Sequence, residues 1–409
     1  MECRYSMGKK VKVLEMASTF PRWEGDTEPD FIYQLSKRLK KEFDIVVLAP
    51  HCKNAKKQEV MEGVNVFRFS YFFIKFQQLA YDGGIVNKLK VKKWTAILIP
   101  FFMFFCLVNL ILLIRREQIR IIHAHWIIPM GIIAIITKYL YFGKLKVVCT
   151  SHGGDMYCFN GFFLKKLKVF FLNRCDHITV VSTAMKNDLI SWGGDEKKIS
   201  VISMGVDLKN TFTEGNQINK KQNSALFVGR LVPKKGVHVL VKAAAVAKER
   251  NAPFQLDIIG AGPERKSLEK LVIDAKIQDY VNFLGPRKHD DLPEIFRSYS
   301  VTCIPSITAD SGDKEGLGLV TIEAMGCGCT VVASDFEAVH DVVEHGKTGI
   351  IIPQNDAITL AEAITDLFSN ENKQKILAEN GRNYVLQKYD WKNISGKYIC
   401  LIKNLTEPD

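Results

Sequence analysis

The chain has 409 residues, 47% hydrophobic and 24% charged, a composition that is ordinary for a packed globular protein of two or three domains. The formal net charge of +12 is concentrated in residues 1–215, which carry 32 Lys+Arg against 19 Asp+Glu, while residues 216–409 carry 24 against 25. The first half is therefore expected to face an anionic partner, a membrane surface or nucleic acid. Nucleic acid is excluded, because no zinc-finger, ribonucleoprotein or helix-turn-helix signature accompanies the basic runs.

The ten cysteines are scattered, without a CxxC pair or a His–Cys zinc spacing. Cys327 and Cys329 lie among small residues and are interpreted as packing residues rather than metal ligands. This usage predicts a reducing, cytoplasmic compartment. The stretch that opens the chain is not read as a signal peptide, because its apolar part alternates and is too short.

Short apolar segments recur along the chain and alternate with stretches of helical period such as 234–250. This rhythm predicts an α/β fold of two doubly wound, Rossmann-like domains with parallel sheets, and a ligand cleft at the carboxyl ends of the strands. The polar stretch 209–223 is interpreted as a linker, so the domains are expected at 1–212 and 213–391. The expected strands are 10–17, 44–50, 64–70, 120–126, 146–152, 177–182 and 199–205, then 225–230, 255–262, 281–285, 301–306, 330–334 and 348–353.

The segment 97–114 has no charge and has basic residues on both sides. As a helix it would reach roughly 27 Å, close to the thickness of a bilayer core. Pro100 and Asn109 interrupt it, and a crossing would separate strands that belong to one sheet. A buried or membrane-surface helix is therefore favoured over a membrane span.

Two loops of the second half contain candidate residues for an anionic ligand. In GRLVPKKG, the strand ends before Arg230, and Lys235 precedes a helix, so two cations and helix amides are expected to form an anion site; a solvated basic loop is the alternative. In IIGAGPER, Gly260 and Gly262 form half of a dinucleotide fingerprint, although tight strand–helix turns use the same glycines.

Histidines end two strands of the first half. TSHGGDM places His152 and Asp155 beside two glycines, where a histidine can act as acid, base or hydrogen-bond donor. HAHW ends a neighbouring strand, and His125 or Trp126 either lines the cleft or packs in the core.

The stretch DKEGLGLVTIEAMGCG follows an expected strand and a polar loop. A helix is expected to begin near Gly318, with free amides that suit a phosphate or a sugar oxygen. Glu323 then lies about one turn into the helix, and its carboxylate suits the cis-diol of a ribose. Glu315 in the loop can accept hydroxyl groups of a second sugar. A nucleotide sugar is thus the expected ligand.

The order of these motifs along nearly the whole chain resembles glycosyltransferase family 4, the retaining nucleotide-sugar enzymes of the GT-B fold. The pair of glutamates seven residues apart, together with GR-x4-KG, carries this resemblance, and HAHW, TSHGGDM, SMGVD and FLGPRK support it. The first strand–helix loop departs from the family in having one glycine in place of a pair, and Met204 stands where an asparagine is common.

The resemblance implies a role for each candidate. Glu323 would bind the ribose, Glu315 would hold the donor hexose, Arg230 and Lys235 would neutralise the diphosphate, and His152 would lie near the sugar. Pro286 and Arg287 would meet the base through their backbone, and Gly260 and Gly262 would approach the nucleotide. The backbone amides near the sugar and phosphate would be those of Gly316, Leu317, Gly318 and Leu319. A C-terminal helix, about 392–409, would return to the first domain.

The resemblance also implies transfer with retention, by attack on the face from which the leaving group departs. A two-step route needs a nucleophilic carboxylate, and an inverting route a base such as His152 or Asp155; the residues alone leave these open. The sequence contains no Asp-x-Asp, so no metal and no other cofactor is expected, with Arg230, Lys235 and helix amides in place of the metal.

The basic, apolar first half favours a saccharide or lipid-linked acceptor and peripheral binding at the inner face of the membrane. In the alternative interpretation, the positive field attracts only the nucleotide sugar or a polyanionic glycan. Two other functions are weighed against a transferase: a nucleotide-sugar epimerase of similar fold, and a non-catalytic protein that binds sugar nucleotides at a membrane.

Overall fold

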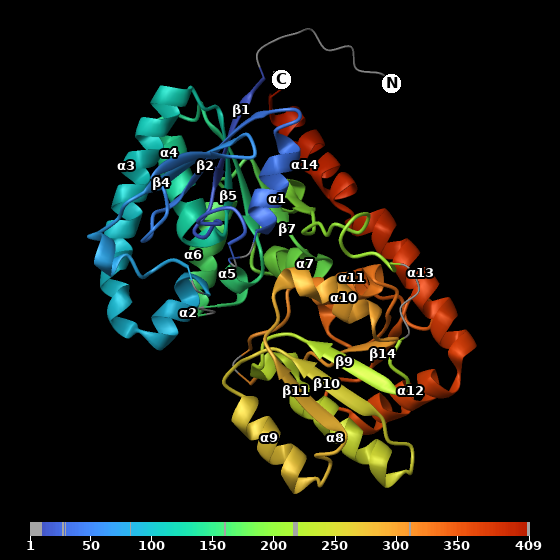
Figure 1. The fold of residues 1–409 in the computed structure, drawn as a ribbon. Coiled ribbons are helices and arrows are strands. Elements are labelled where there is room, and N and C mark those ends of the chain that lie inside the picture. The colour runs from blue at the N-terminus through green and yellow to red at the C-terminus, as the bar shows by residue number, and fades with distance from the viewer. Residues whose placement is uncertain are drawn as a thin grey trace, which may run out of the picture. The chain divides into compact units, whose positions relative to one another are not determined.

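The chain folds into two compact units in the computed structural model (Figure 1). The first unit holds the chain up to Val181, Met185–Ile202 and the residues from Ser395 on, and the second holds Ser182–Ala184 and Ser203–Ile394. The structure describes residues 10–26, 28, 30–81, 83–158, 161–215, 220–310 and 312–406.

The first unit is built on a sheet of eight strands among the described residues, in the order β3-β4-β2-β1-β5-β6-β7-β8. All neighbours run parallel except β3, which is antiparallel to β4. Seven of these strands were predicted; β3 was not, because its residues QEVM are largely exposed and lack an apolar run. The strands are β1 (Lys12–Met16), β2 (Asp44–Pro50), β3 (Gln58–Met61), β4 (Val64–Phe69), β5 (Ile121–His125), β6 (Lys146–Ser151), β7 (His177–Val180) and β8 (Ile199–Val201).

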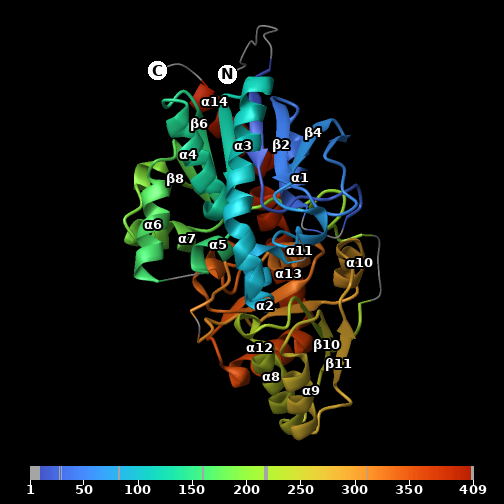
Figure 2. The ribbon, with the colours of Figure 1, turned by 90° about the vertical axis from the view of Figure 1, so that its left-hand side faces the viewer.

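Helices cover both faces of this sheet, with α3 and α4 on one side and α1 and α14 on the other (Figures 1 and 2). Two of the helices, α7 and α14, begin in the second unit. The helices are α1 (Phe31–Leu39), α2 (Gly84–Val91), α3 (Ile99–Glu117), α4 (Ile132–Leu140), α5 (Gly154–Tyr157), α6 (Phe162–Leu172), α7 (Thr183–Ser191) and α14 (Trp391–Thr406).

Helix α3 contains residues 99–114 of the long apolar segment, and Lys93–Glu117 could cross a membrane by its length and composition alone. One face of the helix packs on the unit as predicted: the Phe102 ring lies 5.1 Å from the rings of both Phe69 and Tyr71. Pro100 does not interrupt the helix, because it lies in the first turn, where its missing N–H costs no bond. The opposite face is exposed, with Phe101, Phe104, Phe105 and Leu112.

The second unit has a fully parallel sheet in the order β11-β10-β9-β12-β13-β14 among its described residues, and the sequence predicted all six strands. Its buried core lies between this sheet and helices that include α8 and α12. The strands are β9 (Ser224–Val228), β10 (Gln255–Ile259), β11 (Val281–Gly285), β12 (Val301–Ile304), β13 (Thr330–Ser334) and β14 (Ile350–Ile352). The helices are α8 (Val237–Glu249), α9 (Arg265–Asp274), α10 (Leu292–Arg297), α11 (Leu319–Gly326), α12 (Ala357–Ser369) and α13 (Glu371–Tyr389).

The stretch 209–223, interpreted as a linker, is folded onto the second unit in its first part. The Arg297 guanidinium donates to the backbone oxygens of Thr211 and Thr213 at 2.9 and 2.7 Å, which ties this segment down. The units divide between Ile202 and Ser203, earlier than the predicted 212/213. Residues 216–219 of the stretch, like 407–409 of the predicted C-terminal helix, lie outside the described residues.

Helix α14 is part of the first unit from Ser395 on. The Tyr398 hydroxyl is buried against the sheet of the first unit, 3.4 Å from the hydroxyls of Thr150 and Thr179. The Lys403 ammonium pairs with Glu42 at 2.7 Å. The helix therefore joins the first unit in the way that the resemblance implied.

Candidate active site

A basic loop and an acidic loop meet in the second unit. The basic loop follows β9 and carries the exposed Arg230 and the partly buried Lys234 and Lys235. The Lys235 ammonium lies 2.6 Å from the Glu315 carboxylate, and both side chains are about 85% buried, with 14 and 15% exposed. Lys234 pairs with Asp313 of the same acidic loop at 3.1 Å. The sequence assigned Glu315, Arg230 and Lys235 to one nucleotide-sugar site, and the structure brings Glu315 and Lys235 together.

The charge state of Glu315 is set by the neighbouring cations of the basic loop. Burial by itself would raise the pKa of its carboxyl, but the charges of Lys235 and Lys234, the hydrogen bond from Lys235 and the charge of Arg230 lower the pKa to about 2. Glu315 is therefore a carboxylate at neutral pH. It can accept hydrogen bonds from hydroxyl groups, and it cannot serve as a proton donor.

Helix α11 begins at Leu319, as predicted. Gly318, its N-cap, has a φ of 82°, a left-handed conformation that glycine adopts without strain. The preceding residues Gly316 and Leu317 join it to Glu315, so the first amides of the helix lie one short loop away from the ion pair with Lys235. Amides at the start of a helix have no partner within it and attract anions.

Glu323 lies in the second turn of α11 and is buried, with 5% of the residue exposed. Its Oε1 is 3.1 Å from Nε2 of His289, an exposed residue whose ring lies 5.3 Å from that of Phe212. His289 follows the exposed Pro286 and Arg287 in the loop after β11. Sequence reasoning missed His289, because neither spacing nor residue type links this loop to a glutamate in another segment.

Gly260 and Gly262 have a packing reason to be glycine. A Cβ atom on Gly260 would lie 1.8 Å from the Gly229 oxygen, and one on Gly262 would lie 2.2 Å from the Leu231 oxygen. The loop after β10 therefore packs directly against the backbone on either side of Arg230. The two glycines support the basic loop.

In the first unit, Asp155 fixes the turn that carries His152. The Asp155 carboxylate accepts hydrogen bonds from the backbone of Ile127 at 2.7 Å, the hydroxyl of Ser151 at 2.9 Å and the backbone of His152 at 3.1 Å. Burial raises the pKa of this carboxyl although these bonds oppose the rise. Asp155 is thus committed to holding the loop.

The His152 ring lies among three other rings. Its centroid is 4.7 Å from Phe31 and 5.3 Å from Trp126, and it stacks on His125 at 5.3 Å. Nε2 of His152 is 3.0 Å from Nδ1 of His125. Burial, and then the neighbouring His125 and His123, lower the pKa of His152 well below 6.5, so the ring is neutral at pH 7.

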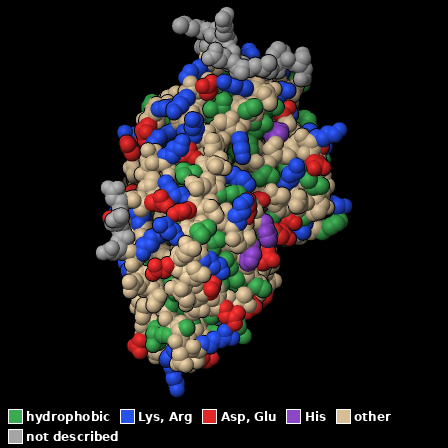
Figure 3. Space-filling model, turned by 90° about the vertical axis from the view of Figure 1, so that its right-hand side faces the viewer, with side chains coloured by type: hydrophobic (Ala, Val, Ile, Leu, Met, Phe, Trp, Pro, Cys, Tyr) green, Lys and Arg blue, Asp and Glu red, His purple; other side chains and the backbone are tan. Residues whose placement is uncertain are grey.

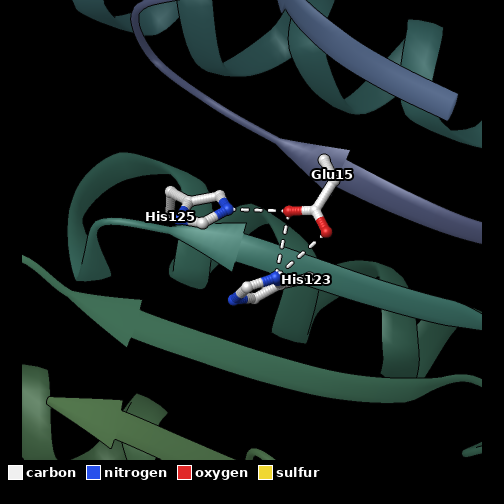
Figure 4. Close-up of side chains that lie close together, drawn as sticks. All are labelled: Glu15, His123 and His125. Atoms are coloured by element: carbon white, nitrogen blue, oxygen red, sulfur yellow. Dashed lines mark hydrogen bonds and ion pairs between the residues drawn. The ribbon is translucent and has the colours of Figure 1, made fainter. Parts of the chain in front are cut away.

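Behind His152 lies a buried cluster of Glu15, His123 and His125 from the strands β1 and β5 (Figure 4). Glu15 Oε2 is 2.7 Å from Nε2 of His125 and 2.9 Å from Nδ1 of His123. Side chains of these types can bind a metal ion. Of these three residues only His125 was a candidate from the sequence. The available signal for Glu15 was a charged residue inside an apolar strand, and His123 had none beyond its place in HAHW.

Comparisons with known proteins agree with this architecture. The chain matches the family described as "Glycosyl transferases group 1" over residues 209–384 and the family described as "Glycosyltransferase Family 4" over residues 30–210. An uncharacterized glycosyltransferase of Methanocaldococcus jannaschii is 28% identical over 93% of this chain and 95% of its own length. A GDP-mannose-dependent phosphatidylinositol monomannoside mannosyltransferase of Mycobacterium tuberculosis is 26% identical over 64% of this chain and 70% of its own.

Two solved structures share the fold over nearly the whole chain. Sucrose-phosphate synthase from Thermosynechococcus elongatus has a TM-score of 0.76 at 21% identity and covers 97% of this chain and 99% of its own. HepE of Anabaena, solved in complex with UDP and glucose, has a TM-score of 0.70 at 19% identity and covers 97% and 100%.

The two α/β units, with their parallel sheets, the basic loop after β9 and the paired glutamates, are those of a glycosyltransferase with the GT-B fold. Within that class, the chain belongs to the group 1 glycosyl transferases of glycosyltransferase family 4. The two family matches together cover residues 30–384.

Proposed function

We propose that this glycosyltransferase moves a hexose, with retention and without a metal ion, from a nucleoside diphosphate sugar to a saccharide or lipid-linked saccharide acceptor. The buried Lys235–Glu315 pair beside Arg230 and the start of α11 is the observation that carries the proposal. The structure of HepE in complex with UDP and glucose supports a nucleotide sugar as the donor class.

The basic loop supplies the positive charge that the leaving group needs. When the sugar departs, negative charge develops on the diphosphate, and fixed cations and amides stabilise that charge best where water is excluded. Lys235 and Arg230, with the first amides of α11, are the groups of the second unit that can take this role. These groups would neutralise the diphosphate in place of a divalent cation. Transfer is therefore expected to continue at an undiminished rate in EDTA.

The two glutamates recognise hydroxyl groups. Glu315 is ionised and already faces the cations that bind the diphosphate, so a hexose attached to that diphosphate lies within reach of its carboxylate. Glu323 is buried one turn further along, where its two oxygens suit the diol of the ribose. Oε1 of Glu323 lies 3.1 Å from Nε2 of His289, so binding of the ribose requires His289 to share this oxygen or to move away from it.

The carboxylates of the first unit near His152 are not placed to act as nucleophiles, which supports same-face attack rather than a two-step route. A two-step route needs a carboxylate that can reach the anomeric carbon. Asp155 is held by three hydrogen bonds, and Glu15 is fully buried. Neither is available as a nucleophile. His152 is instead proposed to contact the sugar through a hydrogen bond.

A screen of nucleoside diphosphate sugars for release of free nucleoside diphosphate tests the donor site. Release is expected from one donor, with Glu323→Ala and Lys235→Ala strongly impaired. Parental rates in both variants would refute the site assignment. Proton NMR of the product gives the anomeric configuration, and inversion would refute the proposed stereochemistry.

We also propose peripheral binding to an anionic membrane at the cytoplasmic face. The exposed side of α3 continues into residues 73–76, because the Phe72 ring lies 5.1 Å from that of Phe101 and 6.2 Å from that of Phe76. The exposed apolar residues of this surface, here called the aromatic patch, are Phe73, Ile74, Phe76, Trp94, Ile97, Phe101 and Phe104.

The charges around the patch suit an acidic lipid surface. Lys75, Lys92 and Lys93 are exposed among its residues, and apolar insertion combined with basic charge is what holds peripheral proteins on anionic lipid. The side of the molecule that carries α14 shows basic and acidic side chains interspersed (Figure 3). Such a mixed surface gives no comparable attraction.

Flotation with vesicles of phosphatidylcholine and phosphatidylglycerol tests this binding. The protein is expected to float with the anionic vesicles at low salt and less at high salt. Ile97→Ser combined with Phe104→Ser should weaken flotation, and Ile273→Ser combined with Ile358→Ser, at two positions of the second unit that are more than half exposed, should not. Absence of flotation at low salt would refute the proposal.

A further inference from the structure

A continuous chain of hydrogen bonds connects His152 to the buried centre of the first unit. It runs from Nε2 of His152 to Nδ1 of His125 at 3.0 Å, and from Nε2 of His125 to Glu15 at 2.7 Å. His123 meets the same carboxylate through Nδ1, and its Nε2 lies 2.7 Å from the Thr150 hydroxyl. Glu15, His123 and His125 are almost completely buried, so water does not compete for these bonds.

The direction of each hydrogen bond follows from the carboxylate at the centre. Burial alone would raise the pKa of Glu15, but the charge of His123 and the hydrogen bonds of His123 and His125 lower it to about 2, so this group only accepts. Nε2 of His125 must therefore carry the proton. Burial lowers the pKa of His125 to about 4, and the neutral ring leaves Nδ1 as an acceptor.

The last bond of the chain fixes His152. Because Nδ1 of His125 accepts, Nε2 of His152 must donate, and in the neutral ring Nδ1 of His152 then has a lone pair. This Nδ1 is buried and has no hydrogen-bond partner within the described residues. A buried acceptor without a partner is costly, so it marks a position where a ligand donor can bind.

We propose that Glu15 and His125 are positioning residues that hold His152 in the Nε2–H tautomer, so that its Nδ1 accepts a hydrogen bond from a hydroxyl group of the sugar. This inference rests on the proposed function for the identity of the hydroxyl donor. The tautomer itself depends only on the buried chain Glu15–His125–His152.

A metal ion held by Glu15, His123 and His125 would be the other use of this cluster. A tetrahedral ion with bonds of about 2.0–2.1 Å keeps its ligand atoms roughly 3.3 Å apart. The observed separations of 2.7 and 2.9 Å between Glu15 Oε2 and the histidine nitrogens are hydrogen-bond distances. The geometry therefore favours protons over a metal ion between these groups.

Two substitutions of His125 separate positioning from packing. In His125→Gln the amide oxygen can accept from His152 while the amide nitrogen donates to Glu15, so the chain is kept. In His125→Phe the ring volume is kept and both bonds are lost. We expect kcat/KM to fall about tenfold or more in His125→Phe, on the scale of a lost hydrogen bond to a buried partner, and to recover largely in His125→Gln. Equal losses in both variants would overturn the proposal.

Nitrogen NMR of protein labelled with 15N-histidine measures the tautomer without any activity. His152, assigned by its absence in His152→Asn, is expected to show a protonated Nε2 and an unprotonated Nδ1. Glu15→Gln keeps the side-chain shape but adds an N–H donor, and a mixture of both tautomers is expected. An unchanged tautomer in His125→Phe and Glu15→Gln, or one metal ion per chain by elemental analysis, would overturn the proposal. If the proposed function alone were wrong, transfer would be absent while these spectra stayed as expected.

Discussion

The Lys235→Met substitution tests whether one ion pair serves both stability and catalysis. It removes the ammonium that lies 2.6 Å from Glu315 and nearly preserves the volume of the side chain. Glu315 is left as a largely buried carboxylate, with Lys234 and Arg230 as the remaining compensating charges. Removal of one partner of a buried pair costs about 3–5 kcal/mol when no other charge compensates.

The magnitude can be bounded from the pKa of Glu315. Its lowering from 4.5 to about 2 corresponds to about 3 kcal/mol of stability shared among all three cations. Lys235 lowers the pKa of Glu315 more than the other two cations do. Lys235→Met is therefore expected to destabilise the second unit by about 1–3 kcal/mol at pH 7. Catalysis is expected to fall by about 10²–10³-fold, the usual effect of losing one group that stabilises the leaving charge.

The sign of the pH dependence follows from the same shift. A carboxyl whose pKa is lowered by folding contributes stability above its unfolded pKa, and this contribution is lost as the pH falls through the folded pKa. The parent therefore loses this stability between about pH 4.5 and pH 2. In Lys235→Met the contribution is smaller from the start, so the stability difference between the two proteins should shrink over that range.

Urea unfolding at several pH values, together with donor turnover, measures both effects. The double variant Lys235→Met with Glu315→Gln removes the uncompensated charge, so stability at pH 7 should recover while turnover stays low. If Lys235→Met were as stable as the parent at every pH, or if the double variant regained turnover, the reasoning about this pair would be wrong.

Three further outcomes are expected. Glu323→Gln should raise the KM for the donor about tenfold through weaker binding of the ribose diol. On a donor that lacks the 2′-hydroxyl the difference between parent and variant should be smaller, and a full tenfold difference there would contradict the ribose assignment. Gly260→Ala should unfold or severely destabilise the second unit, because the new Cβ would lie 1.8 Å from the Gly229 oxygen, and thermal unfolding with circular dichroism detects this; a parental melting temperature would refute the packing role. Phe102→Ala should cost about 3–5 kcal/mol in urea unfolding, whereas Phe104→Ala on the exposed face of α3 should cost close to nothing, and similar costs would contradict the packing of this helix.

Most of the fold could be predicted because its signals are local. Each strand of a parallel sheet buried on both faces is a short apolar run, and each run was visible without knowledge of its neighbours. The strand β3 lacked such a run, and its pairing with β4 follows from the hairpin that tertiary packing holds at the sheet edge. The start of α11 was predictable because the glycines before Leu319 are a local helix-start signal.

The candidate site was predictable only where a motif follows its own strand. Arg230, Lys235, Glu315, Glu323 and His152 all occupy loops or helix starts after strands, so sequence order placed them at the carboxyl ends of the sheets. The sequence assigned Lys235 and Glu315 to one ligand site, but the direct ion pair between them, far apart in the chain, was not predicted.

The partners of these residues were decided by the tertiary structure alone. Glu15 and His123 are 108 residues apart, and they meet because β1 and β5 are neighbours in the sheet. His289 reaches Glu323 from a different loop, and Arg297 ties down a segment whose polar composition resembles a linker. The sequence by itself determined which segments become strands and which side chains end them, because period and turn chemistry are read within a few residues. Only the folded sheet decided which buried charges face each other, because strand order brings together residues that no local pattern connects.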